Sequence, residues 1–185
     1  MKMNEMIKSF PDQIIDQFEN LSSLQLTQDK FSKVNNIVVA GMGGSAISGD
    51  LIKLFLKNEI DIPITVIRDY AIPNWTNENT LFILSSYSGN TEETLSCFSL
   101  AVLKSKKVIS ITTGGSLENE SLKHEVPVVK IPKGFQPRAA LGFSLISLLC
   151  VFNKIKILNS DFIDKIIDAT KSLYQYMDEF CKEGG

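Results

Sequence analysis

The chain has 185 residues, of which 44% are hydrophobic and 22% charged, and its formal net charge at pH 7 is -2. This composition is typical of one globular domain, and the chain is long enough to bury a sizeable core. The charge balance excludes an overall basic field, so we expect neither nucleic acid nor a membrane as a partner. A local site for a small anion is compatible with this balance.

The sequence favours a reduced, cytoplasmic protein. Its longest apolar stretch, residues 141–152, is too short to span a bilayer and fits a buried helix. The N-terminus lacks the basic-then-apolar pattern of a secretory signal. The cysteines are few and odd in number, which favours free thiols over a disulfide framework. They are Cys97, Cys150 and Cys181.

Short apolar runs alternate with amphipathic ones along the first two thirds of the chain. The first predicted element is an amphipathic helix that begins near Pro11. The next elements, in chain order, are a strand at 37–40, a helix at 45–57, strands at 64–67 and 81–85, a helix at 91–104, and strands at 108–112 and 128–131. After residue 134 the pattern is helical, with one helix over 138–152 and another from Ser160 or Asp161 to about Cys181.

Strands that alternate with helices predict an α/β fold, in which a parallel sheet carries helices on both faces. Ligands of such sheets bind beyond the carboxyl ends of the strands. Three loops rich in glycine, serine or threonine follow predicted strands, at residues 41–49, 85–94 and 112–115. We therefore expect these loops to share one rim of the sheet and to form a binding site there.

The first loop, GMGGSAISG at residues 41–49, joins a strand to a helix. The N-terminus of a helix offers free backbone N–H groups and a positive dipole end, which favour an anion. The loop also satisfies the G-x-G-x-x-A form of a dinucleotide fingerprint, and Asp69 could be the acidic residue that a nicotinamide enzyme places after its second strand. A third interpretation is that the glycines only permit a tight turn.

The second loop, residues 85–94, separates these interpretations because it carries a cluster of hydroxyl groups. A terminal phosphate has three acceptor oxygens and nearly two charges, so it favours hydroxyl donors such as Ser86, Ser88 and Thr91. A pyrophosphate is held mostly by the backbone of one glycine turn. Gly89 would let the backbone approach the ligand closely. The second loop therefore predicts a site for a phosphate monoester.

Helix capping is the structural alternative for the same loop. Asn90 and Glu93 have the spacing of a capping box. Capping needs only one such polar residue, however, and the loop has four within six positions. Glu92 and Glu93 are expected to complement the helix dipole. Tyr87 either walls the pocket or packs beneath it.

Arg138 is the third candidate feature. It follows Pro137 and leads into the apolar helix, so we place it at or near a helix N-terminus, where the dipole disfavours a cation. An arginine beside a polar rim could neutralise a phosphate or a developing enediolate. The alternative is an exposed surface arginine. The single histidine, His124, has no second histidine or cysteine nearby, so we expect a surface residue and no metal site.

Residues 41–50, 86–94 and the PRAALG string at 137–142 resemble the sugar isomerase (SIS) domain family, and more narrowly its bifunctional phosphoglucose/phosphomannose isomerases. The resemblance implies a three-layer α/β/α sandwich around a five-stranded parallel sheet, of flavodoxin-like type, with a helical C-terminal extension. It also implies a cofactor-free reaction that interconverts glucose 6-phosphate or mannose 6-phosphate with fructose 6-phosphate by moving a proton between C1 and C2.

The same resemblance implies catalytic and substrate-binding roles for individual residues. Arg138 would be catalytic and would stabilise the enediolate. The residues implied to bind the phosphosugar are Gly43, Gly44, Ser45, Ser86, Ser88 and Thr91.

Full-length members of this family have two SIS domains, and their catalytic glutamate and histidine lie beyond the region matched here. The resemblance therefore implies an SIS domain at residues 1–158, followed by a helix at 159–185 that links it to a second domain. We expect this chain to be inactive alone, and to form a homodimer or pair with a second SIS domain. Two alternatives stay open: a non-catalytic regulatory module that binds sugar phosphates, and an NAD(P)-binding oxidoreductase domain.

Overall fold

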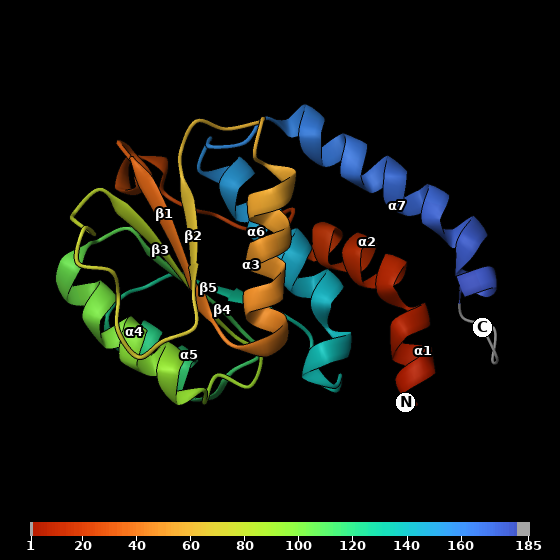
Figure 1. The fold of residues 1–185 in the computed structure, drawn as a ribbon, viewed down its shortest axis with the longest axis horizontal. Coiled ribbons are helices and arrows are strands. Elements are labelled where there is room, and N and C mark those ends of the chain that lie inside the picture. The colour runs from red at the N-terminus through yellow and green to blue at the C-terminus, as the bar shows by residue number, and fades with distance from the viewer. Residues whose placement is uncertain (1, 181–185) are drawn as a thin grey trace.

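A computed structural model describes residues 2–180 of the chain. Five strands form one all-parallel sheet in the order β2-β1-β3-β4-β5 (Figure 1). They are β1 (Asn36–Gly41), β2 (Ile64–Ile67), β3 (Thr80–Ser86), β4 (Val108–Thr112) and β5 (Val128–Lys130). This is the strand order of the flavodoxin-like doubly wound sheet, as predicted.

The inner strands β1, β3 and β4 are buried at every residue. Their side chains alternate between two layers of core: Ile37 and Val39 join one, whereas Val38 and Ala40 join the other. A parallel strand covered on both faces is expected to be a continuous apolar run, because both sets of side chains are buried. The predicted strands therefore match the observed ones to within one residue at each end.

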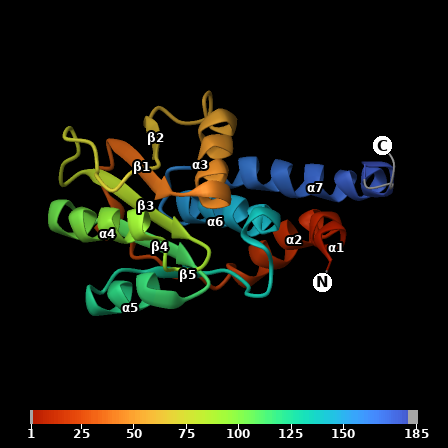
Figure 2. The same ribbon diagram turned by 60° about the horizontal axis from the view of Figure 1, so that its bottom comes forward.

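Seven helices and two 3-10 turns surround the sheet in the part of the chain that the structure describes. They are α1 (Met3–Lys8), α2 (Phe10–Asn20), η1 (Gln28–Phe31), α3 (Gly43–Phe55), α4 (Glu92–Lys104), α5 (Gly115–Lys123), η2 (Pro137–Ala139), α6 (Leu141–Lys154) and α7 (Ser160–Phe180). Helices α4 and α5 cover one face of the sheet, and α3, α6 and α2 cover the other (Figures 1 and 2). Phe98 and Leu117 fill the first interface, and Ile52 and Phe143 the second. The result is a three-layer sandwich, with α7 running alongside α2.

Helix α6 lies between α2 and α3 in the middle of its layer (Figure 1). Its residues 142–152 are all buried, which explains why this helix is apolar around its whole circumference. None of the helices in the described range is both long and apolar enough to cross a lipid bilayer.

The structure corrects several predicted element boundaries. The helix expected over residues 138–152 begins only at Leu141, because the preceding Pro137–Ala139 segment forms the separate turn η2. Helices α1 and α5 have no counterpart among the predicted elements. Of the nine residues of α5 only Leu117 and Ser121 are buried, so its sequence has no clear apolar period. The last helix begins at Ser160 as expected, and its predicted end near Cys181 lies outside the described residues.

Cys97 and Cys150 are free thiols buried in the core, as predicted. Burial raises the pKa of Cys97 to about 11 and that of Cys150 to about 12, so both thiols stay protonated at neutral pH. Their burial and protonation make them packing residues rather than nucleophiles. Cys181 lies outside the described residues.

Candidate functional site

The three loops predicted to share a rim lie together in the structure. They follow the adjacent inner strands β1, β3 and β4, whose parallel pairing brings their carboxyl ends to one edge of the sheet. The second and third loops touch through glycine: a Cβ on Gly89 would overlap the carbonyl oxygen of Gly114, and Gly89 has a φ of 72°. Only glycine fits there, on grounds of both space and backbone conformation. The predicted rim is therefore confirmed.

The hydroxyl groups of the second loop form a small cluster at the start of α4. Ser86 Oγ and Thr91 Oγ1 lie 2.8 Å apart, and either can donate the hydrogen bond between them. Ser86 is 2% exposed, and its Oγ also accepts the Gly89 N–H at 3.1 Å. Ser88 is exposed, and its Oγ accepts the Asn90 N–H at 3.1 Å. One O–H of the Ser86–Thr91 pair and the O–H of Ser88 thus stay free to donate.

The capping box considered for this loop is not present. Thr91 is the N-cap of α4, and no side chain caps the helix. The Asn90 amide oxygen instead accepts the Ser116 N–H at 3.0 Å and ties the second loop to the first turn of α5. The free N–H groups of the first turn of α4 therefore remain available to an anion. Glu92 and Glu93 lie in that turn as expected, where they complement the helix dipole.

The first loop leads directly into α3, whose first residue is Gly43 with a φ of 50°. Ser45 is 7% exposed, and its N–H donates to the carbonyl oxygen of Met42. Gly44 adjoins the segment that carries Arg138, because a Cβ on Gly44 would lie 2.8 Å from the carbonyl oxygen of Pro137. The N-terminus of α3 thus meets the predicted catalytic segment.

Arg138 lies in the 3-10 turn η2, immediately before α6, so the prediction of a position near that helix N-terminus is correct. Its side chain is exposed and makes no hydrogen bond or ion pair with another described residue. It borders an apolar groove of about 360 Å³ that is otherwise lined by Met6, Ile7, Phe10, Ala139, Leu141 and Met177. The structure thus brings the backbone of Arg138 to Gly44 but records no bond from its guanidinium to the three hydroxyls.

Tyr87 is half-buried and packs against the core. The half-buried phenol donates to the carbonyl oxygen of Pro132 at 3.0 Å and accepts the Phe135 N–H at 2.9 Å. Burial raises the pKa of the Tyr87 phenol above its ordinary value, so the phenol stays neutral and can make both bonds. Tyr87 therefore joins the hydroxyl loop to the segment that leads into Arg138.

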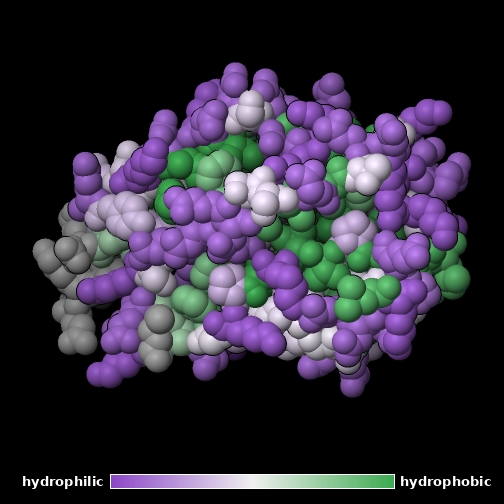
Figure 3. All heavy atoms as spheres, turned by 180° about the vertical axis from the view of Figure 1, so that it is seen from behind, coloured by the Kyte–Doolittle hydropathy of each residue, from purple (hydrophilic) through white to green (hydrophobic). Residues whose placement is uncertain are grey.

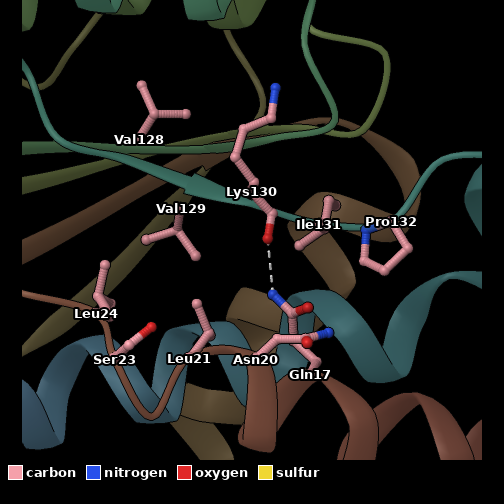
Figure 4. A pocket seen from close by; sticks show the side chains of 10 residues that line it. All are labelled: Gln17, Asn20, Leu21, Ser23, Leu24, Val128, Val129, Lys130, Ile131 and Pro132. Carbon is pink, nitrogen blue, oxygen red and sulfur yellow. Dashed lines mark hydrogen bonds between the residues drawn. The ribbon is translucent and has the colours of Figure 1, made fainter.

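A cavity of about 420 Å³ lies elsewhere, between the end of α2 and the edge strand β5 (Figure 4). Figure 4 shows the Gln17 amide donating to the carbonyl oxygen of Lys130, whose ammonium group points away from the cavity. None of the predicted site residues lines this cavity. Half of its lining residues are leucine, valine or isoleucine, and its polar lining residues include no histidine, cysteine or carboxylate.

The structure also places the residues considered for metal or acid–base roles. Within residues 2–180, no cluster of three or more histidine, cysteine or acidic side chains could hold a metal ion. His124 is exposed at the end of α5, with its ring edge against Phe98 at 5.8 Å between centroids, as expected of a surface residue. Asp69 follows β2, and its carboxylate accepts the Tyr70 N–H at 2.6 Å.

Two residues that organise this region escape prediction from the sequence. Gln13 and Gln17 lie one turn apart on α2, and each is 1% exposed. Gln13 bonds to Ala139 and Gly142 on either side of the start of α6, and Gln17 bonds to Lys130 and Ser147. Two glutamines on the apolar face of an amphipathic helix are the only signal the sequence offers.

Comparison with known proteins agrees with this geometry. A family model described as "SIS domain" matches residues 30–152. The bifunctional phosphoglucose/phosphomannose isomerase of Caldicellulosiruptor bescii is 42% identical over 168 residues, which are 91% of this chain and 49% of the relative. The protein of the same name from Thermoplasma volcanium is 40% identical and matches 76% of this chain and 44% of its own length. The chain thus spans about half the length of these relatives.

Solved structures show the same fold. The C-terminal domain of glucosamine-fructose-6-phosphate aminotransferase from Francisella tularensis has a TM-score of 0.72 at 16% identity, over 94% of this chain and 53% of that one. Tagatose-6-phosphate ketose/aldose isomerase from Escherichia coli has a TM-score of 0.66 at 22% identity, over 95% and 54% of the two chains. With the matched family model, the parallel five-stranded sheet and the hydroxyl loop after β3, these likenesses show that the chain belongs to the SIS domain family.

Proposed function

We propose that this chain is the phosphate-holding half of an aldose–ketose isomerase that interconverts glucose 6-phosphate or mannose 6-phosphate with fructose 6-phosphate. The observation that carries the proposal is the hydroxyl cluster at the uncapped start of α4, with Ser86 Oγ and Thr91 Oγ1 2.8 Å apart. The sequence relatives named as bifunctional phosphoglucose/phosphomannose isomerases support the choice of substrates.

The phosphate of the sugar is held by hydroxyl and backbone donors. Ser88 and one member of the Ser86–Thr91 pair have free O–H groups, and the first turn of α4 adds free N–H groups. Hydrogen bonds to an ionised phosphate oxygen are about twice as strong as neutral ones. Glu92 and Glu93 compete with the anion for the helix dipole. The hydroxyl groups therefore matter more here than the dipole does.

The sugar chain extends from the phosphate towards the first loop and Arg138. Gly43, Gly44 and Ser45 line this side of the pocket, and Gly44 adjoins the Arg138 segment. Moving a proton between C1 and C2 passes through an enediolate, whose negative charge the guanidinium of Arg138 stabilises. Because the aldose and the ketose are isomers with no net difference in oxidation state, the proposed reaction consumes no oxidant or reductant.

The general base and the group that opens the sugar ring come from a second SIS domain. The relatives are about twice as long as this chain, which leaves room for such a domain. We assign residues 1–158 to one SIS domain and residues 159–185 to the connection with the next, in a cytoplasmic enzyme.

Pairing with a second copy or a second SIS domain is part of the proposal. Helix α6 offers little apolar surface for it, because its residues 142–152 are buried within the chain. Apolar side chains are instead visible in several places on the face opposite to that of Figure 1, with polar side chains between them (Figure 3). Burial of this apolar surface would favour association.

Calorimetric titration of the purified chain tests the proposed ligand. We expect fructose 6-phosphate and inorganic phosphate to bind, and NADP to bind more weakly than either. Binding of NADP alone would favour the oxidoreductase alternative, in which the first loop holds a pyrophosphate and Asp69 a ribose.

An isomerase assay separates the enzyme from a regulatory module. The chain alone should convert no glucose 6-phosphate, and conversion should appear when the C-terminal half of the Caldicellulosiruptor bescii relative is added. Turnover by the chain alone would show that it holds its own base. Binding without turnover in every mixture would favour a non-catalytic regulatory module.

A further inference from the structure

We propose that Gln13 is a positioning residue that fixes the backbone from which the Arg138 side chain extends, an inference that rests on the proposed function of Arg138. Gln13 lies on α2, 125 positions before Arg138 in the sequence, and has no place in the phosphate loops. Its amide is nevertheless bonded to the backbone on the C-terminal side of Arg138.

A single amide group satisfies two backbone groups of the Arg138 segment. Gln13 Nε2 donates to the carbonyl oxygen of Ala139 at 2.7 Å, and Gln13 Oε1 accepts the Gly142 N–H at 3.1 Å. The Gly142 N–H belongs to the first turn of α6, where the N-cap residue is Ala140 and has no polar side chain. Gln13 thus supplies from another helix the cap that α6 lacks.

The environment of Gln13 fixes the orientation of the amide. The side chain is 1% exposed, and its Nε2 also donates to the carbonyl oxygen of Met6 at 3.1 Å. The carbonyl oxygens of Met6 and Ala139 both need the NH₂ group of Gln13 as their donor, whereas the Gly142 N–H needs its amide oxygen as an acceptor. A buried amide with both ends bonded cannot turn without leaving polar groups unpaired, which makes it a rigid support.

Close packing holds the same segment in place. A Cβ on Gly142 would lie 2.9 Å from Gln13 Cβ, so α2 and the start of α6 approach as closely as glycine permits. On the other side, the carbonyl oxygen of Pro137 rests against Gly44 at the N-terminus of α3. The turn that carries Arg138 is therefore clamped between α3 and Gln13.

This clamp determines the placement of Arg138. Its guanidinium makes no hydrogen bond or ion pair with another described residue, so the backbone of η2 alone sets where the side chain begins. An arginine that must meet a developing enediolate has to be held close to its productive geometry. Of the side chains bonded to the Ala139–Gly142 backbone within residues 2–180, Gln13 is the one that can impose this geometry.

The test compares Gln13→Met with Gln17→Met in the full 185-residue chain. Gln17 is a matched control, because it lies on the same helix, is equally buried and bonds to Lys130 and Ser147 instead of the Arg138 segment. The two probes are inorganic phosphate and arabinonate 5-phosphate, whose carboxylate imitates the enediolate.

We expect Gln13→Met to lower the affinity for arabinonate 5-phosphate about tenfold, which corresponds to the loss of one charge-assisted hydrogen bond. The same variant should change the affinity for inorganic phosphate less than about twofold. Gln17→Met should change neither affinity. In chains that also carry Arg138→Ala, Gln13→Met should have no further effect. Equal losses for both probes, or an undiminished Gln13 effect without Arg138, would overturn the proposal.

A second readout needs no ligand. In the nuclear magnetic resonance spectrum, Gln13→Met should lower the order parameter of the Arg138 backbone N–H group and speed exchange of the Gly142 amide, whereas Gln17→Met should do neither. An unchanged Arg138 order parameter would overturn the positioning role. A different result would contradict the proposed function: an unchanged affinity for inorganic phosphate when Ser88→Ala is introduced into the parent chain.

Discussion

Ser88 is the hydroxyl of the second loop that solvent reaches most directly. It is exposed, and its Oγ accepts only the Asn90 N–H, whereas Ser86 is buried and paired with Thr91. A phosphate oxygen can therefore accept a hydrogen bond from the Ser88 O–H group without breaking an existing bond. We regard Ser88 as the residue whose loss affects binding most and stability least.

Replacing Ser88 with alanine should weaken inorganic phosphate binding about tenfold, because a hydrogen bond to a charged group contributes roughly 1.5–3 kcal/mol. Calorimetry at constant pH measures this change. Ser99→Ala is the control, since Ser99 is also exposed but bonds to Leu95 within α4. Equal affinities for the two variants would remove Ser88 from the site.

The second and third loops touch at Gly89, so we expect Gly89→Ala to lower the stability of the chain strongly. Its φ of 72° and the overlap with the Gly114 carbonyl combine to cost about 3 kcal/mol or more of unfolding free energy. Gly134→Ala separates the two causes. Gly134 has a φ of 98° but open space around it, so that variant should lose only about 1–2 kcal/mol in urea titrations. A mild effect at Gly89 would contradict the observed contact.

The cluster of hydroxyl residues could be predicted from the sequence because its members lie within six positions of one loop. The role of Gln13 could not, because its partners Ala139 and Gly142 lie 126 and 129 positions away and are backbone groups. The role of Asn90 also depends on a residue far away in the sequence. Its spacing to Glu93 fits a capping box within α4, but its amide oxygen accepts the N–H of Ser116 on another helix.

At the scale of elements, Tyr87 connects β3 and its loop to the segment that precedes η2. Tyr87→Phe removes the bonds to Pro132 and Phe135 and leaves a half-buried N–H unpaired, which should lower the free energy of unfolding by about 1–3 kcal/mol. Urea denaturation measures the loss. Tyr70→Phe, at an exposed phenol 3.5 Å from Glu92, should leave the free energy of unfolding almost unchanged. Similar losses for both would show that the bridge contributes nothing.

Helix α7 is joined to α2 by a bond that depends on pH. The Tyr174 phenol donates to Asp12 at 2.6 Å, and this bond raises the pKa of Tyr174 from 10 to about 12. A pKa raised by folding gives stability that is full below the unfolded value and lost as pH rises through the folded one. The stability difference between the parent chain and Tyr174→Phe should therefore be constant up to about pH 10 and vanish by about pH 12. A difference independent of pH would contradict this bond.

Elements with a strong period were predictable, and those without one were not. The strands β1, β3 and β4 are buried at every position and contain short apolar runs, because both faces of the sheet are covered. Helix α5 buries only Leu117 and Ser121, so its polar sequence gave no helical pattern. The break at η2 depends on how Pro137 packs against Gly44, which no local pattern encodes.

At the scale of the whole molecule, the sheet order turns three distant loops into one site. The loops after β1, β3 and β4 meet because these strands are neighbours, and the PRAALG segment reaches the same place across the N-terminus of α3. The alternation of strands and helices predicted this rim. It did not predict that the guanidinium of Arg138 would border an apolar groove with α1 and α7, because that depends on how the terminal helices pack.

The central claim is that a sugar phosphate binds at the rim of β1, β3 and β4. Titrating isotopically labelled chain with fructose 6-phosphate, and following the backbone amides by nuclear magnetic resonance, tests it most directly. We predict the largest shifts at residues 86–93, with smaller ones at Gly43–Ser45 and Arg138. Shifts confined to the cavity beside β5, or no saturable shift on the rim, would contradict the account.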